Sequence, residues 1–147
     1  MDAVIWMTGY VGSDVEFREV REDLVFASFR LACTPRTRKS GEWVDGETTW
    51  LGVTCSRALA DNARSSITKG DPVIVVGKLR TNRWQDSQGV ARERLLLEAV
   101  AIGHDLNRGT ASFTKNTRPV VDEVQVNLGE LVMATEFEDE ETGTRAA

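Results

Sequence analysis

The segment Leu24–Thr34 alternates apolar and other residues with a period of two, and this pattern restricts the fold more than any other part of the chain. The odd positions from Val25 to Cys33 are all apolar, whereas the even positions include Ser28 and Arg30. Successive side chains of a β-strand point to opposite faces of the sheet. The segment is therefore predicted to be a strand with one buried face.

Similar patterns predict four further strands and several connecting segments. The strands are Val4–Val11, Thr48–Cys55, Pro72–Trp84 and Val90–Ile102. A short extension is predicted at Val15–Val20, and Asp86–Gly89 is predicted to form a turn. The polar segment Pro35–Glu47 contains two glycines and is typical of a long hairpin loop.

One helix is predicted over Ser56–Thr68. Leu59, Ala63 and Ile67 recur there with a spacing of four, which gives a narrow apolar stripe on a helix. Ser56 is expected to cap the start of this helix and Gly70 to end it.

The order of three strands, one helix and two strands indicates an all-β fold. It is typical of a five-stranded Greek-key barrel of the OB type, with the helix between the third and fourth strands. We expect residues 1–108 to form this domain and residues 109–147 to form a polar-to-acidic extension. The extension contains a predicted extra strand at Val120–Val126 and the acidic block Glu136–Glu141, and its end is expected to be disordered in isolation.

The net charge of −5 belongs entirely to the extension. Residues 1–108 carry 15 Lys and Arg against 15 Asp and Glu, whereas residues 109–147 carry 3 against 8. The predicted barrel is neutral in sum, so the binding of an anionic partner depends on where its charges lie.

The third predicted strand carries an aromatic residue on the face opposite its apolar residues. In the third strand Leu51, Val53 and Cys55 form the apolar face, which leaves Trp50 on a face with glycine and threonines. Such a ring is suited to stacking a nucleic-acid base. A tryptophan buried under a loop or at a subunit contact fits the pattern of this strand equally well.

The fourth strand adds cations to the predicted stacking surface. Lys78, Arg80 and Trp84 share a face of a regular strand, so cations can neutralise phosphates beside a stacked base. The fifth strand and the long loop carry further basic residues. The candidate DNA-binding residues are Arg36, Arg38, Lys39, Trp43, Trp50, Lys78, Arg80, Arg83, Trp84, Arg92 and Arg94.

Signatures of catalysis are missing from the sequence. It has no phosphate-cradling glycine loop with Lys-Ser/Thr and no Gly-x-Ser-x-Gly elbow. His104 is the only histidine and is interpreted as structural, and the cysteines Cys33 and Cys55 lack metal-binding spacing. We therefore expect no enzyme, no metal and no cofactor. Without a long apolar run or a secretory signal, we expect no membrane contact and a cytoplasmic location.

Several motifs together resemble those of bacterial single-stranded-DNA-binding proteins over residues 2–106. They are Gly9–Gly12, Gly41–Trp43, Thr49-Trp50, Leu59-Ala60 and the run Lys69–Trp84 (KGDPVIVVGKLRTNRW). The resemblance implies a homotetramer around which DNA is wrapped, with bases stacked on Trp50 and Trp84. It further implies sequence-independent binding and protection of single-stranded DNA in replication, recombination or repair, in association with the nucleoid.

The sequence departs from this family's pattern at three places. Arg38 or a near neighbour stands where many members carry an aromatic residue, and Ser56 stands where another aromatic residue is usual. The acidic block is followed by Arg145-Ala146-Ala147 rather than by the family's terminal Pro-Phe. We interpret the protein as a paralogue with a specialised role, whose partners include recombination or repair proteins.

Two alternatives are compatible with the sequence. One is a protein-interaction OB subunit with weak or no DNA binding, suggested by the missing aromatics and the neutral barrel. The other is a nuclease that uses carboxylate-bound magnesium. Only scattered acidic residues support this alternative.

Overall fold

The computed structural model describes residues 1–117, and residues 1–111 form one compact unit. Eight strands and one helix occur in this described part. They are β1 (Val4–Val11), β2 (Glu16–Arg21), β3 (Leu24–Cys33), β4 (Arg36–Lys39), β5 (Glu42–Asp45), β6 (Thr49–Ser56), α1 (Arg57–Ser66), β7 (Pro72–Gln85) and β8 (Ala91–His104).

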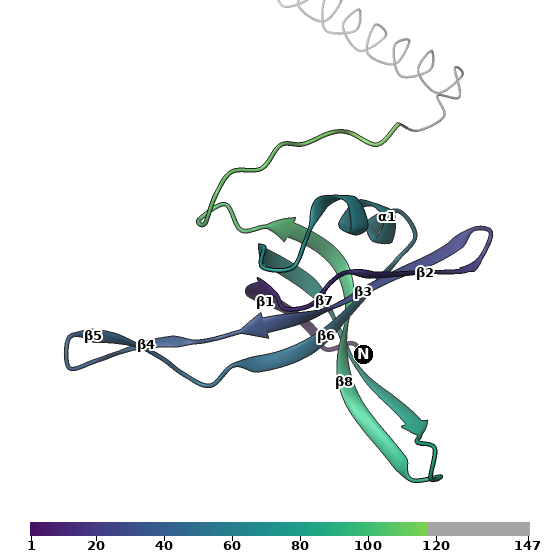
Figure 1. Ribbon diagram of the computed structural model, residues 1–147, viewed down its shortest axis with the longest axis horizontal. Coiled ribbons are helices and arrows are strands. Elements are labelled where there is room, and N and C mark those ends of the chain that lie inside the picture. The colour runs from purple at the N-terminus through teal and green to yellow at the C-terminus, as the bar shows by residue number, and fades with distance from the viewer. Residues whose placement is uncertain (118–147) are drawn as a thin grey trace, which may run out of the picture. The chain divides into compact units, whose positions relative to one another are not determined.

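Five of the strands close into a ring. The main sheet has the order β1-β7-β8-β6-β3-β2, and β1 pairs additionally with β3 (Figure 1). The pairing of β6 with β8 is parallel, whereas all other neighbours are antiparallel. The strand β2 pairs only with β3, outside the ring, and β4 and β5 form a separate two-stranded hairpin.

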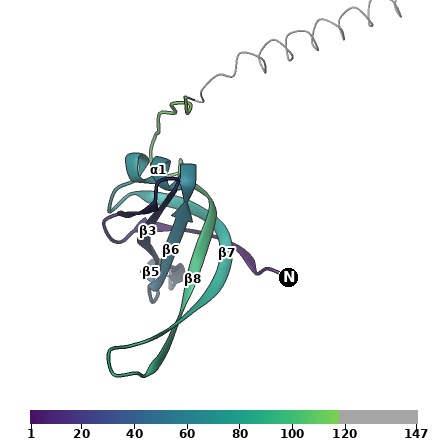
Figure 2. The same ribbon diagram turned by 90° about the vertical axis from the view of Figure 1, so that its right-hand side faces the viewer.

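The core lies inside the ring and is built by the alternating strands. In β3 the odd positions Ala27, Phe29 and Leu31 are buried, as the period-two pattern predicts. The helix α1 covers the end of the ring opposite the tip of the β7–β8 hairpin (Figure 2). It contributes buried side chains at Ala60 and Ala63, and the following Ile67 is also buried.

A β-bulge adjusts the register where β8 bends across β7. Val76 pairs with Ala101 and Gly77 with Ala99, so Val100 is an extra residue in β8. A Cβ atom on residue 77 would overlap the backbone carbonyl of Glu98. Glycine at this position therefore permits the close approach of the two strands. Because the extra residue is in β8, the alternation of β7 continues undisturbed.

The structure corrects several expectations. The segment Pro35–Glu47 contains the strands β4 and β5 rather than only a loop, and β2 is a full strand. Residues 1–117 therefore contain eight strands rather than the five that were predicted. Ser56 occupies the N-cap position, but its hydroxyl makes no capping hydrogen bond. The helix ends before Gly70, because Ile67 already has extended backbone angles.

Among residues 1–117 no helix is both long and apolar enough to cross a bilayer. The predicted strand Val120–Val126 and the predicted disorder around Glu136–Glu141 lie outside the described residues.

Candidate nucleic-acid interface

The outer face of β6 carries Trp50 beside small side chains. Direct antiparallel partners have side chains on the same face of a sheet. Trp50 pairs with Ala32, and Thr54 pairs with Ser28, while Leu51 and Val53 point into the ring. Trp50 is 48% exposed, so it is not buried under a loop, which was one of the alternatives that the sequence left open.

Two neighbours fix the position of the Trp50 ring. The guanidinium of Arg30 lies over the indole, 4.6 Å from its centroid, which is a cation–π contact. Gly12 lies at the edge of the ring, and a Cβ atom at position 12 would overlap indole atom Cζ3. The backbone N–H of Gly12 also donates to the Arg30 carbonyl at 2.7 Å. The ring is therefore positioned by Arg30 of β3 and by Gly12, which directly follows β1.

Trp84 lies on the long β7–β8 hairpin and, like Trp50, has an arginine next to its ring. It is 42% exposed and pairs directly with Arg92. The guanidinium of Arg94, diagonally across the hairpin, lies 5.3 Å from the Trp84 ring centroid. Both candidate stacking rings thus carry an arginine against the indole.

The outer faces of β6 and β8 meet at the parallel pairing. Gly52 pairs with Leu96, and a Cβ atom on residue 52 would stand 2.8 Å from a Leu96 methyl group. Leu96 also pairs with Arg80 on β7. The face that carries Trp50 therefore continues across β8 to the face that carries Arg80 and Trp84.

Lys78 and Arg80 lie on this face, as predicted, but acidic side chains accompany them. Asp2 accepts from Lys78 at 3.2 Å and from Arg80 at 3.0 Å, and Glu98 accepts from Arg80 at 3.1 Å. The hydrogen bond from Lys78 and its charge, followed by those of Arg80, lower the pKa of Asp2. Ala3 accepts a backbone hydrogen bond from the Leu79 N–H at 2.8 Å, which holds the N-terminal segment against β7.

Three other predicted cations also form ion pairs. Arg83 lies on the opposite face of the hairpin from Trp84 and pairs with Glu93 at 3.1 Å. Arg92 pairs with Asp86 at 3.1 Å, and Arg36 pairs with Asp45 at 2.8 Å. The pKa of Asp86 is lowered, first by the backbone hydrogen bond from Val90 and further by Arg92. These ion pairs are exposed to solvent, so each contributes little to stability. Another anion can therefore readily replace the carboxylate in each pair.

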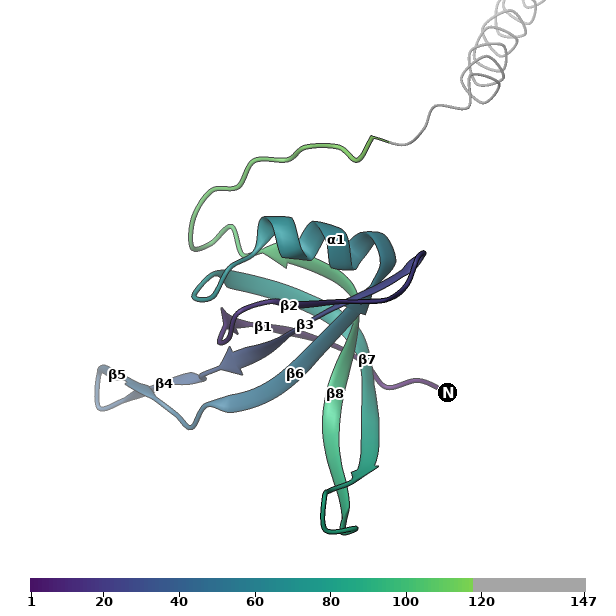
Figure 3. The ribbon, with the colours of Figure 1, turned by 45° about the vertical axis from the view of Figure 1, so that its right-hand side comes forward.

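The β4–β5 hairpin is a separate arm. Arg38 pairs directly with Trp43 on one face, and Lys39 lies on the other face. Figure 3 displays this arm and the β7–β8 hairpin pointing away from the ring in different directions. The structure therefore distributes the predicted residues over the ring and two arms. Among described residues, the predicted cations without an acidic partner are Arg38, Lys39 and Arg94.

Sequence reasoning missed Arg30, Phe26 and Arg18 on the outer face. The alternation of β3 contains the signal for the first two, because they occupy even positions of that strand. Arg18 is the direct β2 partner of Phe26. Trp6, which is 72% exposed on β1, was likewise missed.

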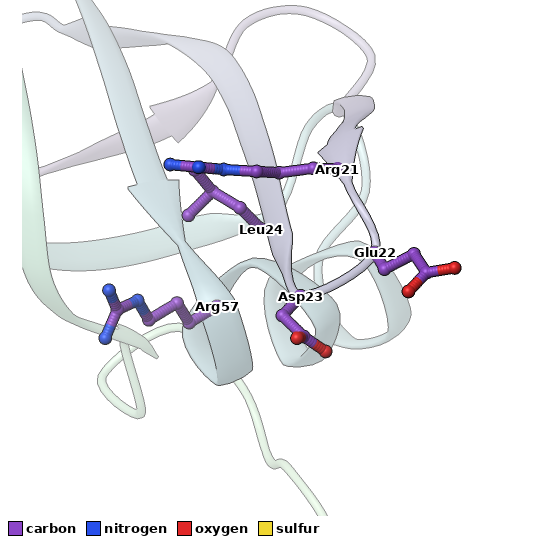
Figure 4. A pocket seen from close by; sticks show the side chains of 5 residues that line it. All are labelled: Arg21, Glu22, Asp23, Leu24 and Arg57. Atoms are coloured by element: carbon purple, nitrogen blue, oxygen red, sulfur yellow. The ribbon is translucent and has the colours of Figure 1, made fainter.

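Two shallow hollows lie beside the β2–β3 ribbon. One, of about 680 Å³, is lined by residues that include Arg18, Phe26, Thr54 and Arg94. The other, of about 480 Å³, lies at the β2–β3 turn and the start of α1. Figure 4 shows the Arg21 and Arg57 side chains extending to the side opposite the carboxylates of Glu22 and Asp23.

The remaining polar groups have structural roles. The His104 ring lies 3.4 Å from an Asp71 carboxylate oxygen, which agrees with a hydrogen-bonded structural histidine. The pKa of Asp71 is lowered, chiefly because it accepts the Thr68 backbone N–H. Both cysteines are free. In residues 1–117 no three His, Cys, Asp or Glu side chains gather to form a metal site.

Comparisons with known proteins identify similar chains. A profile of the Single-strand binding protein family matches residues 2–104. The chain is 41% identical over 113 residues to "Single-stranded DNA-binding protein 2" of Tropheryma whipplei, covering 76% of this chain and 74% of that one. It is 40% identical over 119 residues to "Single-stranded DNA-binding protein 1" of Streptomyces coelicolor, covering 80% and 75%.

Solved structures give the same result. The crystal structure of a small single-stranded DNA-binding protein from Streptomyces coelicolor matches with a TM-score of 0.66 and 38% identity, over 74% of this chain and 99% of that one. A second single-stranded DNA-binding protein from Mycobacterium smegmatis matches with a TM-score of 0.60 and 24% identity, over 78% and 100%. The latter likeness concerns the fold alone.

Proposed function

This chain belongs to the Single-strand binding protein family, and we propose that it binds single-stranded DNA without sequence preference and without catalysis. The observation that carries this proposal is the pair of half-exposed indoles, Trp50 and Trp84, each with an arginine against the ring. Bases stack on indole faces whatever their identity, because every base has a π-face. The family match favours this function over that of a protein-interaction subunit without DNA binding.

In the proposed mechanism, bases stack on Trp50 and Trp84 while arginines and lysines neutralise the phosphates. Arg94 lies next to Trp84 without an acidic partner in the described residues, so it is ready to contact phosphate. Lys78 and Arg80 become available only when a phosphate replaces Asp2 or Glu98. Trp43, Arg38 and Lys39 extend the surface on the β4–β5 arm.

We assign this function to residues 1–108 and regard residues 109–147 as a separate extension. The ring of β1, β3, β6, β7 and β8 fits a five-stranded Greek-key barrel of the OB type, with β2 and the β4–β5 arm as additions. In that numbering, α1 stands between the third and fourth barrel strands.

We further propose that the protein acts as a homotetramer on nucleoid DNA and cooperates with recombination or repair proteins. Protection of exposed single strands is needed in replication, recombination and repair, so any of these processes is compatible with the proposed activity. The mass from light scattering, measured with and without a long thymidine oligonucleotide, tests the tetramer.

The proposed function is tested by fluorescence polarisation with a labelled thymidine oligonucleotide and with a duplex of equal length. Binding to the single strand is expected to be tight at low salt, to weaken as salt rises, and to exceed binding to the duplex. Absence of binding to the single strand at low salt would refute the proposal, as would equal binding to the duplex.

A further inference from the structure

Phe26 is an aromatic side chain on the outer face that no part of the proposed function uses. It occupies an even position of β3, so it points away from the core formed by Ala27 and Phe29. Its side chain is 38% exposed although it is a large apolar group. An exposed ring on the outer face of the sheet is available for contact with a ligand.

The two strands beside Phe26 leave the ring uncovered and place a cation next to it. Its direct partner on β6 is Ser56, whose small side chain cannot cover a phenyl ring. Its direct partner on β2 is Arg18. Arg18 has no acidic partner within residues 1–117. An exposed phenyl ring therefore has, as a direct cross-strand neighbour, an arginine without an ion pair in these residues.

The same ring lines the larger of the two hollows. Phe26, Arg18, Thr54 and Arg94 are among the residues around this hollow of about 680 Å³, and Glu16 is its one acidic residue. A volume of this size accommodates a small organic group such as a nucleotide. The two arginines outnumber the single carboxylate, which favours an anionic occupant.

Arg94 connects this hollow with the stacking residue Trp84, because its guanidinium lies 5.3 Å from that ring. Trp50 lies on the same outer face of the β3–β6 ladder, six residues from Ser56 along β6, or roughly 20 Å. Phe26 and Trp50 thus stand at opposite ends of one ladder, with Ser28, Arg30 and Thr54 between them.

We propose that Phe26 is a third stacking position for single-stranded DNA, with Arg18 and Arg94 contacting the phosphates of the nucleotide in this hollow. The inference rests on the proposed function, since it assigns a further subsite on the same surface.

The test compares full-length F26L and F26Y proteins with the unchanged protein by polarisation with a thymidine oligonucleotide. Leucine keeps apolar bulk but removes the π-face, whereas tyrosine keeps it. F26L is expected to weaken binding about fivefold or more, by a similar factor at each salt concentration, while F26Y binds normally. F113L, which alters an exposed phenylalanine far along the chain from the sheet, serves as the matched control and is expected to bind normally.

A second variant tests the cationic part of the subsite. R18Q is expected to reduce the slope of log affinity against log salt by about 0.7, because one phosphate contact is lost from a single strand. Normal binding by F26L, equal weakening by F26L and F26Y, or an unchanged slope for R18Q would overturn this inference. If the unchanged protein itself fails to bind the oligonucleotide, the proposed function is refuted instead.

Discussion

Arg30 holds its guanidinium over the indole of Trp50, 4.6 Å from the ring centroid, and thereby links β3 to the candidate stacking surface on β6. A planar guanidinium stacked on one face of the ring leaves a defined surface for a base. It also brings a positive charge next to the expected path of the phosphates. The relationship makes Arg30 a positioning residue for Trp50.

Replacing Arg30 by alanine is therefore expected to weaken binding of a thymidine oligonucleotide about three- to tenfold, given that an exposed cation–π contact contributes roughly 0.5–1 kcal/mol and that a phosphate contact is lost as well. R30K keeps the charge but not the flat stacking group. It should retain the salt dependence of the unchanged protein while recovering only part of the affinity. Full affinity in R30A would show that the contact has no role in binding.

Gly12 provides a second test of how Trp50 is positioned. A side chain at residue 12 would overlap the indole, so G12A should displace the ring and weaken oligonucleotide binding. The expected cost in the free energy of unfolding is about 1 kcal/mol, as for a typical point substitution. G103A is the matched control, because a Cβ atom there meets nothing within 4 Å. Equal binding by the G12A and G103A proteins would contradict the positioning role.

Asp2 is predicted to compete with phosphate for Lys78 and Arg80. D2N removes the carboxylate charge from this cluster, so single-stranded DNA should bind more tightly and with a steeper salt dependence. D14N, at an exposed aspartate without an ion pair among the described residues, should leave both quantities unchanged. Unaltered affinity in D2N would mean that these cations take no part in binding.

The same ion pairs have a defined pH dependence. Because the pKa of Asp2 is lowered in the folded protein, their contribution to stability is present above the pKa of Asp2 in the unfolded chain. It is lost as the pH falls through the lowered pKa of the folded state. The difference in thermal midpoint between the unchanged and D2N proteins should therefore shrink in acid.

The two thiols give a prediction that is independent of DNA. Burial raises the pKa of Cys33 and of Cys55, so both remain protonated at neutral pH. Since the thiolate is the reactive form, iodoacetamide should modify both slowly in the native protein and rapidly in denaturant. Mass spectrometry of timed samples measures this. Rapid native modification of Cys55, the more buried thiol, would contradict the structure.

Period-two patterns were sufficient to predict the ring strands, because residues such as Ala27, Phe29 and Val53 must be buried for the sheet to have a core. They also placed Trp50 and Trp84 on the exposed face. Short polar strands such as β4 and β5 lack this signal, because none of their residues is buried. The predicted end of α1 was also wrong. The helix ends at Ser66, because the next residue, Ile67, has extended backbone angles and its side chain is buried in the core.

The ion pairs could not be derived from the sequence. Asp2 and Arg80 are 78 residues apart and meet only because β1 pairs with β7. Arg83 was among the predicted DNA-binding residues, but it is adjacent to Trp84, and adjacent strand residues point to opposite faces. Contacts such as that between Arg30 and Trp50 likewise depend on the register between β3 and β6, which no local pattern specifies.

The central claim is that bases stack on Trp50 and Trp84. It is tested most directly in a W6F/W43F protein, which keeps only these two of the four tryptophans. Addition of a thymidine oligonucleotide is expected to quench the remaining tryptophan fluorescence strongly, and high salt should restore it as the DNA dissociates. Unquenched fluorescence, while polarisation shows that the labelled oligonucleotide is bound, would contradict the account.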